Sequence, residues 1–341
     1  MTPLLHQRLP ELRHSLPHVA LGTPPTPVRR LESVSGEGPE VWVKDEGVFG
    51  DGPWGGNKVR KLEWILPDAK RRGSRTVLTF GALATNHGLA TALYAREQGL
   101  HAALVLLDQP LDDHVRAQLG RLEACGATLH FTHTKPRTAR MLPRLVARHR
   151  SGRQLPYLLP AGGSSAVGSL GYVETAFEIA DQVAKGELPE PSHVVVALGS
   201  GGTSAGLALG LRLAGLRSRL VGIVVNDQLR LDEKTTARLA ARSARLLRRR
   251  GASLPADPPG PGDMTITRRF LGPGYGLVTS GSERAREVAR GEGLALDPVY
   301  TGKAFEGALT LAREGALGAG PVLFVNTHGP REDSPPASAG A

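Results

Sequence analysis

The chain has 341 residues, long enough for one large or two modest domains with a substantial core. Its 42 Lys and Arg against 32 Asp and Glu give a net charge of +10, but no zinc-finger, RNA-recognition or helix-turn-helix signature accompanies this charge and only 4% of the residues are aromatic, so we expect no nucleic-acid partner. The single cysteine, Cys125, excludes an intramolecular disulfide and a zinc site made of cysteines, and we expect it to pack in the core.

The N-terminal region carries no evident targeting signal. Residues 1–17 lack the uninterrupted apolar core of a signal peptide, and no later run reaches membrane-spanning length. We therefore expect a cytoplasmic protein with no membrane partner. Residues 21–31 are rich in proline and predict an extended arm that leads into a first strand at 39–44.

Apolar runs alternate with amphipathic runs over the rest of the chain. They predict strands at 76–80, 102–107, 127–131, 155–159, 193–198, 219–225 and 321–326. Helices are predicted from residue 62 onward and at 85–98, 112–125, 137–150, 168–185, 204–213, 232–250, 282–293 and 302–315. Strict alternation with short connections indicates parallel sheets wrapped by helices. Residues 254–275, rich in proline and glycine, predict a long functional loop, and residues 331–341 predict a disordered tail.

A lysine beside two glycines stands at the start of the first long helix. Residues 55–58, Gly-Gly-Asn-Lys, precede an amphipathic run that begins at Leu62. Adjacent glycines let the backbone approach a ligand, and the helix dipole together with the cations Arg60 and Lys61 would favour a neutral amine on Lys58. Such a lysine can form a Schiff base with a carbonyl compound, pyridoxal phosphate included. A solvated basic helix start would give the same residues, so this stretch alone leaves both interpretations open.

A second glycine-rich stretch follows the predicted strand at 193–198. It consists of Gly199, Ser200, Gly201, Gly202 and Thr203. A strand, a glycine loop and a helix N-terminus together suit an anion such as a phosphate. A nucleoside triphosphate would require a lysine followed by Ser or Thr at the end of the loop, and a dinucleotide would require glycine where Ser204 stands. A compact monophosphate, such as that of pyridoxal phosphate, fits best.

Five motifs, in this order, resemble those of D-cysteine desulfhydrases and 1-aminocyclopropane-1-carboxylate deaminases, which are tryptophan-synthase-β-like, fold type II pyridoxal-phosphate enzymes. They are GGNKVRKLE at 55–63, TNH at 85–87, GSGGT at 199–203, GYG at 274–276 and DPVYTGK at 297–303. The resemblance runs from about residue 23 to 329. It implies an α/β fold of two open parallel-sheet domains wrapped by helices, with the cofactor in the cleft between them. The implied division is a large cofactor-binding domain, residues 1–65 and 164–330, and a small inserted domain, residues 66–163.

The resemblance also implies roles for single residues. Lys58 would be the Schiff-base lysine and, once displaced by the substrate amine, the base beside Cα. Lys61 would reach the phosphate, which the amides of the loop at 199–203 and the hydroxyls of Ser200 and Thr203 would also hold; a solvated lysine and a turn that binds nothing are the alternatives. Asn86 would hydrogen-bond the ring hydroxyl of the cofactor.

The sequence departs from the family before Asn86 and again after His87. Thr85 stands where serine is usual, which keeps a hydroxyl with stiffer rotamers and leaves its role at the substrate open. After His87 the family's desulfhydrases tend to carry a basic and an amide side chain, whereas this chain has Gly-Leu-Ala, so the identity of the substrate is left open. His87 is either a substrate-pocket group or a buried core histidine.

Four further residues are candidates for the site. Tyr275 and Tyr300 match two active-site tyrosines, whose phenols could exchange a proton near the leaving group; packing is the alternative. Thr301 stands where the deaminases have a glutamate that keeps the ring nitrogen protonated, and it offers only a neutral hydrogen bond. Opening a cyclopropane, whose Cα has no hydrogen to remove, needs the stronger electron sink, so Thr301 favours elimination. Thr327 is a candidate second contact on the cofactor.

These features predict a pyridoxal-phosphate-dependent α,β-elimination on a small amino acid, like that of D-cysteine desulfhydrase, which releases pyruvate, ammonia and sulfide. The alternatives on the same fold are 1-aminocyclopropane-1-carboxylate deaminase and a β-replacement or racemase activity. A Rossmann oxidoreductase is disfavoured by Ser204. We expect no metal, and the family's habit suggests a homodimer.

Overall fold

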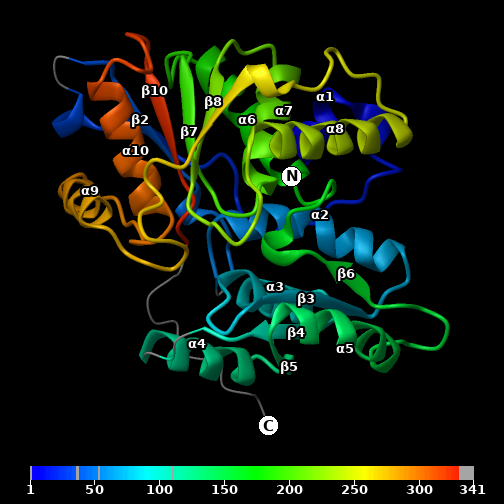
Figure 1. Ribbon diagram of the computed structural model, residues 1–341. Coiled ribbons are helices and arrows are strands. Elements are labelled where there is room, and N and C mark those ends of the chain that lie inside the picture. The colour runs from blue at the N-terminus through cyan, green and yellow to red at the C-terminus, as the bar shows by residue number, and fades with distance from the viewer. Residues whose placement is uncertain (1, 36–37, 53, 110, 112, 330–341) are drawn as a thin grey trace.

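The computed structural model describes residues 2–35, 38–52, 54–109, 111 and 113–329. In this part of the chain two sheets, each flanked by helices, lie one above the other in Figure 1. The larger sheet has the strand order β1-β2-β10-β7-β8-β9, and neighbours are parallel except for β1, which is antiparallel to β2. Its strands are β1 (Val28–Arg30), β2 (Val41–Asp45), β7 (His193–Leu198), β8 (Arg219–Val224), β9 (Met264–Thr267) and β10 (Val322–Asn326).

The smaller sheet has four parallel strands in the order β5-β4-β3-β6. They are β3 (Thr76–Ala82), β4 (His101–Leu107), β5 (Thr128–His133) and β6 (Tyr157–Leu159). Residues 102–106 of the central strand β4 are all buried and apolar. Because helices cover both faces of such a sheet, its central strands need no polar alternation. The predicted architecture of two parallel-sheet α/β units wrapped by helices is confirmed.

The α-helices fall largely where the sequence places them. They are α1 (Leu4–Arg8), α2 (Asn57–Arg71), α3 (Asn86–Glu97), α4 (Asp113–Ala124), α5 (Lys135–Arg148), α6 (Leu170–Ala184), α7 (Gly202–Leu213), α8 (Glu233–Arg249), α9 (Ser280–Gly291) and α10 (Thr301–Arg313). Apart from α1, each overlaps a predicted helix. Gly73 and Gly99 follow α2 and α3 with φ of 74° and 67°. Glycine adopts this left-handed conformation at little steric cost, so it marks the helix end in sequence and structure alike.

Three short elements differ from the prediction. The proline-rich arm forms the edge strand β1 on β2, and the segment predicted as a loop at 254–275 contains the edge strand β9, which pairs with β8. Helix α1, near the N-terminus, was also not predicted. Elements of three to five residues are too short to show a hydrophobic period, and edge strands gain their hydrogen bonds from a distant partner.

Helix α2 lies between the two sheets and joins their cores (Figure 1). Its side chains Trp64, Ile65 and Leu66 are fully buried. The helix packs against α6 on the side of the larger sheet and against α3 on the side of the smaller one. Burial of side chains of this size contributes about 1.5–3 kcal/mol each, so the start of α2 is held from both sides.

The remaining predictions have mixed outcomes. Cys125 packs in the core as predicted, with a buried thiol that donates to the carbonyl of Leu122. No helix within the described ranges is long and apolar enough to cross a bilayer. The predicted domain boundary between residues 65 and 66 falls inside α2, and the division into domains stays a prediction. The predicted disordered tail, residues 331–341, lies outside the described residues.

Candidate active site

The backbone at Gly56 fixes the position of Lys58. Gly56 is the N-cap of α2 with φ 84° and ψ −168°, and a Cβ there would lie 2.7 Å from Cα of Gly329. The amide of Gly55 donates to the carbonyl of Gly329 at 3.0 Å. Only glycine allows this conformation and this close approach of two chain segments. The contact places Lys58, the second residue of α2, beside the segment that leaves the carboxyl end of β10.

The side chain of Lys58 is largely buried, with a small part open to solvent, and its amine has a shifted pKa. Burial lowers the pKa of Lys58 from 10.5 to about 8, against the opposing effect of the Asp297 carboxylate. An amine with such a pKa is partly neutral near physiological pH, as a nucleophile or a base must be. The sequence suggested Arg60 as a cation that favours the neutral amine, but burial is the cause of the lowered pKa.

Arg60 instead anchors α2 in a buried ion cluster. Its Nε donates to Glu46 at 2.9 Å and its Nη1 donates to Glu178 at 2.5 Å, while the guanidinium lies 3.6 Å from the centre of the Phe49 ring. Lys44 pairs with the same Glu178 at 3.2 Å. Removing one partner of such a buried pair leaves an uncompensated charge, so the cluster fixes the helix two residues after Lys58.

Lys61 is buried one turn further along α2 and points to the glycine loop. Its Nζ donates to the carbonyl of Gly162 at 3.0 Å, and a Cβ on Gly202 would lie 3.1 Å from Nζ. Burial and the charge of Lys58 hold the pKa of Lys61 well below its usual value. A buried amine with so few acceptors is suited to an anion, which would restore its charge.

The loop from Gly199 to Thr203 leads into the start of α7, where the Gly202 amide meets a hydroxyl. Gly201 has φ 90°, and the loop leads from β7 directly into α7. Ser164 Oγ lies 2.8 Å from Ser200 Oγ and accepts from the amide of Gly202 at 3.0 Å. A Cβ on Gly202 would lie 2.7 Å from Ser164 Oγ, so any side chain there would fill the space in front of the helix.

Ser164 was not predicted as a site residue. The sequence marks residues 162–165 only as a glycine- and serine-rich loop, and this composition was the available signal. The hydroxyl of Ser164 occupies the place that an anion's oxygen would take at the Gly202 amide. Together with Lys61 and the loop it forms a cradle of backbone and side-chain donors that fits a phosphate.

The start of α3 brings Thr85 and Asn86 to the carboxyl end of β3. Thr85 is the N-cap, and its Oγ1 accepts from the amide of Gly88 at 3.0 Å. A Cβ on Gly88 would collide with the methyl group of Thr85. Asn86 Oδ1 accepts from Gln118 Nε2 at 3.0 Å. Thr85 therefore has a helix-capping role, and the amide of Asn86 has a defined partner.

His87 is buried, with 4% of its surface exposed, and is held by β3. Thr79 Oγ1 donates to the carbonyl of Leu159 and lies 3.1 Å from Nε2 of His87, so Nε2 carries the proton and donates to Thr79. Nδ1 is then an acceptor, buried and without a hydrogen-bond partner among the described residues. Burial and the charges of Lys58 and Lys61 hold the pKa of His87 well below its usual value.

Tyr275 and Tyr300 meet at the start of α10. Their hydroxyl oxygens are 2.5 Å apart and their rings pack edge to face. Burial and the neighbouring Tyr275 raise the pKa of Tyr300 well above its usual value, so Tyr300 stays protonated. A Cβ on Gly199 would lie 3.4 Å from the ring of Tyr300, which puts the tyrosine pair beside the glycine loop.

Thr301 is tied to Asp297 rather than free. Its hydroxyl donates to Asp297 Oδ2 at 2.7 Å, and it accepts from the amide of Asp297 at 2.9 Å. The same carboxylate accepts from the amides of Val299 and Tyr300 at 2.9 and 2.6 Å. The hydroxyl proton of Thr301 is thus committed, and toward any further group Thr301 offers a neutral lone pair.

The predicted residues converge at one end of the sheets. The lysines of α2, the start of α3 and the loop after β7 follow the carboxyl ends of β2, β3 and β7, where open α/β sheets bind ligands. The start of α10 follows α9, and its Tyr300 lies beside the loop after β7. The carbonyl of Thr327, after β10, would lie 3.2 Å from a Cβ on Gly56. A phosphate cradle, a partly neutral lysine and an oriented amide in one place fit pyridoxal phosphate.

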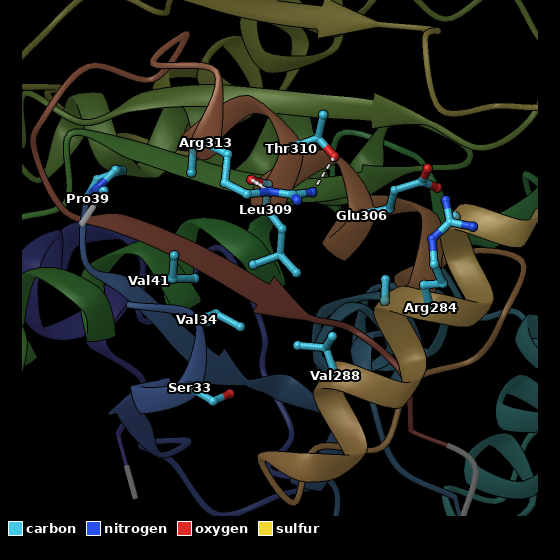
Figure 2. Close-up of a pocket in the computed structure, with 14 residues that line it drawn as sticks. Ser33, Val34, Pro39, Val41, Arg284, Val288, Glu306, Leu309, Thr310 and Arg313 are labelled. Carbon is cyan, nitrogen blue, oxygen red and sulfur yellow. Dashed lines mark hydrogen bonds between the residues drawn. The ribbon is translucent and has the colours of Figure 1, made fainter. Parts of the chain in front are cut away.

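A separate cavity of about 750 Å3 lies elsewhere, as Figure 2 shows. It is lined by the amino end of β2, by α9 and by the second half of α10, and Val41, Val288 and Leu309 are among its apolar residues. None of the predicted site residues lines it. It is therefore distinct from the candidate active site.

Comparisons with known proteins find matches over most of the chain. The family model described as pyridoxal-phosphate dependent enzyme matches residues 19–328. The chain is 35% identical to the D-cysteine desulfhydrase of Klebsiella pneumoniae (strain 342), over 92% of this chain and 94% of that protein. It is 37% identical to a putative 1-aminocyclopropane-1-carboxylate deaminase of Pyrococcus horikoshii, over 95% of each. The crystal structure of an ACC deaminase homologue superposes with a TM-score of 0.78 at 33% identity, covering 96% of this chain and 95% of that one.

Proposed function

The chain belongs to the family of pyridoxal-phosphate-dependent enzymes, and from this premise we propose that it catalyses α,β-elimination on a small amino acid, as a D-cysteine desulfhydrase does. Pyridoxal phosphate is its cofactor. The observation that carries the proposal is the pair of lysines on α2. Lys58 is partly exposed with a pKa of about 8, and Lys61 is buried against the phosphate cradle one turn away.

Each residue of the site would contact a different part of the cofactor. The amides of the loop at 199–203, Lys61 and Ser164 would hold the phosphate, and Lys58 would bond to the carbonyl carbon. Asn86 would donate to the ring oxygen, and Thr301 would face the ring nitrogen. When bound, the cofactor draws off the electron pair that is left at Cα after a proton is removed.

Lys58 and the pair of Tyr275 and Tyr300 would transfer the protons of the reaction. Lys58, as a free amine beside the bound substrate, would accept the Cα proton at Nζ. The bond between the β-carbon and sulfur then breaks, and the sulfur leaves with the electron pair and takes a proton from the tyrosine pair. Tyr300 is protonated at neutral pH, and its hydroxyl lies 2.5 Å from that of Tyr275. Addition of one water releases pyruvate and ammonia beside the sulfide.

Thr301 is the residue that favours elimination over ring opening. A hydroxyl is neutral, so Thr301 offers no charge to the ring nitrogen, and its proton is held by Asp297. Elimination starts from a Cα that carries a hydrogen, and it needs a weaker electron sink than a cyclopropane does. Ring opening of 1-aminocyclopropane-1-carboxylate is the second candidate, supported by the relatives that bear that name.

Product analysis separates the two candidates. The protein, loaded with pyridoxal phosphate, is incubated with D-cysteine, L-cysteine, β-chloro-D-alanine or 1-aminocyclopropane-1-carboxylate, with Lys58→Ala as the control. Sulfide and pyruvate in equal amounts from cysteine, absent with the variant, are the expected result. A four-carbon keto acid from the cyclopropane substrate, with no product from either cysteine, would contradict the elimination and support the second candidate.

We also propose that the protein acts in the cytoplasm as a homodimer of two-domain subunits, with a small domain at residues 66–163. A single buried thiol without a disulfide supports the reducing compartment. The position of the four-stranded sheet between residues 76 and 159 supports the small domain. The resemblance to the family supports the dimer, and light scattering of the purified protein tests it.

A further inference from the structure

Asn86 can turn either end of its carboxamide toward the site, and the two ends have opposite chemistry. Its NH2 group donates, whereas its Oδ1 atom accepts. An anionic ring oxygen would be stabilised by the first and repelled by the second. The orientation of the carboxamide is decided by the residue that hydrogen-bonds to its other end.

That partner is Gln118, on the helix α4 that packs beside α3 (Figure 1). Gln118 is fully buried, and its Nε2 donates to Oδ1 of Asn86 at 3.0 Å. Gln118 could in principle be turned around as well. Arg121 favours the observed orientation, because its Nη1 donates to Oε1 of Gln118 at 3.4 Å and a guanidinium can only donate. Arg121 thus fixes Gln118, and Gln118 fixes Asn86.

We propose that Gln118, held by Arg121, is a positioning residue that turns the NH2 group of Asn86 into the active site to donate to the ring oxygen of the bound cofactor. This inference rests on the proposed function, which assigns that oxygen to Asn86. Gln118 acts through Asn86 and touches neither cofactor nor substrate. The alternative is that Gln118 only fills space between α3 and α4.

Gln118→Glu tests the orientation without changing the size of the side chain. A carboxylate accepts only, so it would take its hydrogen bond from the NH2 group of Asn86 and turn Oδ1 toward the ring oxygen. The readout is the visible absorption band of the lysine-bound cofactor, titrated with pH, together with the Kd for pyridoxal phosphate. We expect the pH midpoint of the band to move upward by about one unit, because loss of a donor makes the ring oxygen a better acceptor for the neighbouring proton. The Kd should rise.

Gln109→Glu is the matched control. Gln109 Oε1 accepts from the amide of Ala84, close to the same helix start, at 3.2 Å. A glutamate keeps that acceptor while adding the same charge, so the midpoint should move by clearly less than in Gln118→Glu. An equal shift in both glutamate variants would assign the effect to charge alone and overturn the proposal.

Three further outcomes bear on the role of Gln118. If Gln118→Glu does not fold, as judged by thermal unfolding of the apoprotein, Gln118→Met frees Asn86 without adding charge and should shift the midpoint in the same direction by less. A midpoint and Kd equal to wild type in every folded Gln118 variant would overturn the proposal and leave Gln118 a packing residue. A wild-type protein with no visible band after addition of cofactor would overturn the proposed function itself, which no result on Gln118 alone can do.

Discussion

The carboxylate of Asp297 raises the pKa of Lys58, while burial lowers it, and the balance of the two is a pKa of about 8. Asp297 is itself held in place, because its oxygens accept from the amides of Tyr300 and Thr301 at the start of α10. The lysine and the carboxylate come from opposite ends of the chain. At pH 7 this balance leaves roughly a tenth of the amine neutral, so that it can react and can still hold a proton.

Lys58→Met should stabilise the apoprotein at neutral pH. The fold lowers the pKa of Lys58 from 10.5 to about 8, so between these values the unfolded chain binds more protons than the folded one, and the free energy of unfolding rises with pH. Removing the amine should therefore add up to about 3 kcal/mol at pH 7, with the gain vanishing above the unfolded pKa. Urea denaturation at pH 7 and pH 10.5 measures this. The exposed Lys70, on the same helix, provides the control Lys70→Met, for which little change is expected.

Asp297→Asn should lower the pKa of Lys58 further, since it removes the charge that opposes burial. The pH dependence of the rate at which the apoprotein bonds pyridoxal phosphate should then move to lower pH. Asp232→Asn is the control, because Asp232 is a helix N-cap at the start of α8 and does not contribute to the pKa of Lys58. A rate profile that is the same in both variants would show that Asp297 does not tune the lysine.

Gly202→Ala should weaken binding of pyridoxal phosphate by at least about tenfold. The new Cβ would lie 2.7 Å from Ser164 Oγ and 3.1 Å from Lys61 Nζ, inside the space assigned to the phosphate. Gly291→Ala, in α9, is the control, because a Cβ there meets nothing within 4 Å. Titrations should show weaker binding of both pyridoxal phosphate and inorganic phosphate. Loss of pyridoxal phosphate binding alone would place the phosphate elsewhere.

Gly88→Ala should destabilise the wild-type protein more than it destabilises a protein that already carries Thr85→Ser. A Cβ at residue 88 would collide with the methyl group of Thr85, which serine lacks, and would lie 2.5 Å from Leu104 Cδ2 in both backgrounds. Overpacking of this kind costs about 1–3 kcal/mol. A double-mutant cycle on the free energy of unfolding measures the coupling between the two positions. Strict additivity would mean that the backbone moves to remove the collision.

Much of the fold and part of the site are local in the sequence. The alternation of apolar and amphipathic runs gave the parallel sheets, and the glycines around Lys58 and at 199–203 are needed for positive φ and for close approach, as at Gly56 and Gly201. The residues of such a loop are neighbours in the sequence, so the sequence shows them together and they could be predicted as one group.

The contacts that tune the site are not local and could not be predicted. Ser164 meets Ser200 across the fold, Arg60 pairs with Glu178 rather than acting on Lys58, and Gln118 reaches Asn86 from a different helix. Each is set by the packing of separate elements. The pKa of Lys58 likewise depends on burial, which a heptapeptide does not show.

The role of Lys58 is tested by the visible absorption spectrum of the purified protein with pyridoxal phosphate, before and after borohydride. We expect a visible band that borohydride bleaches, with the cofactor then fixed covalently on the peptide that contains Lys58, and no such band or adduct in Lys58→Ala. A protein that stays colourless with added cofactor, or an adduct on another lysine, would contradict the assignment of Lys58.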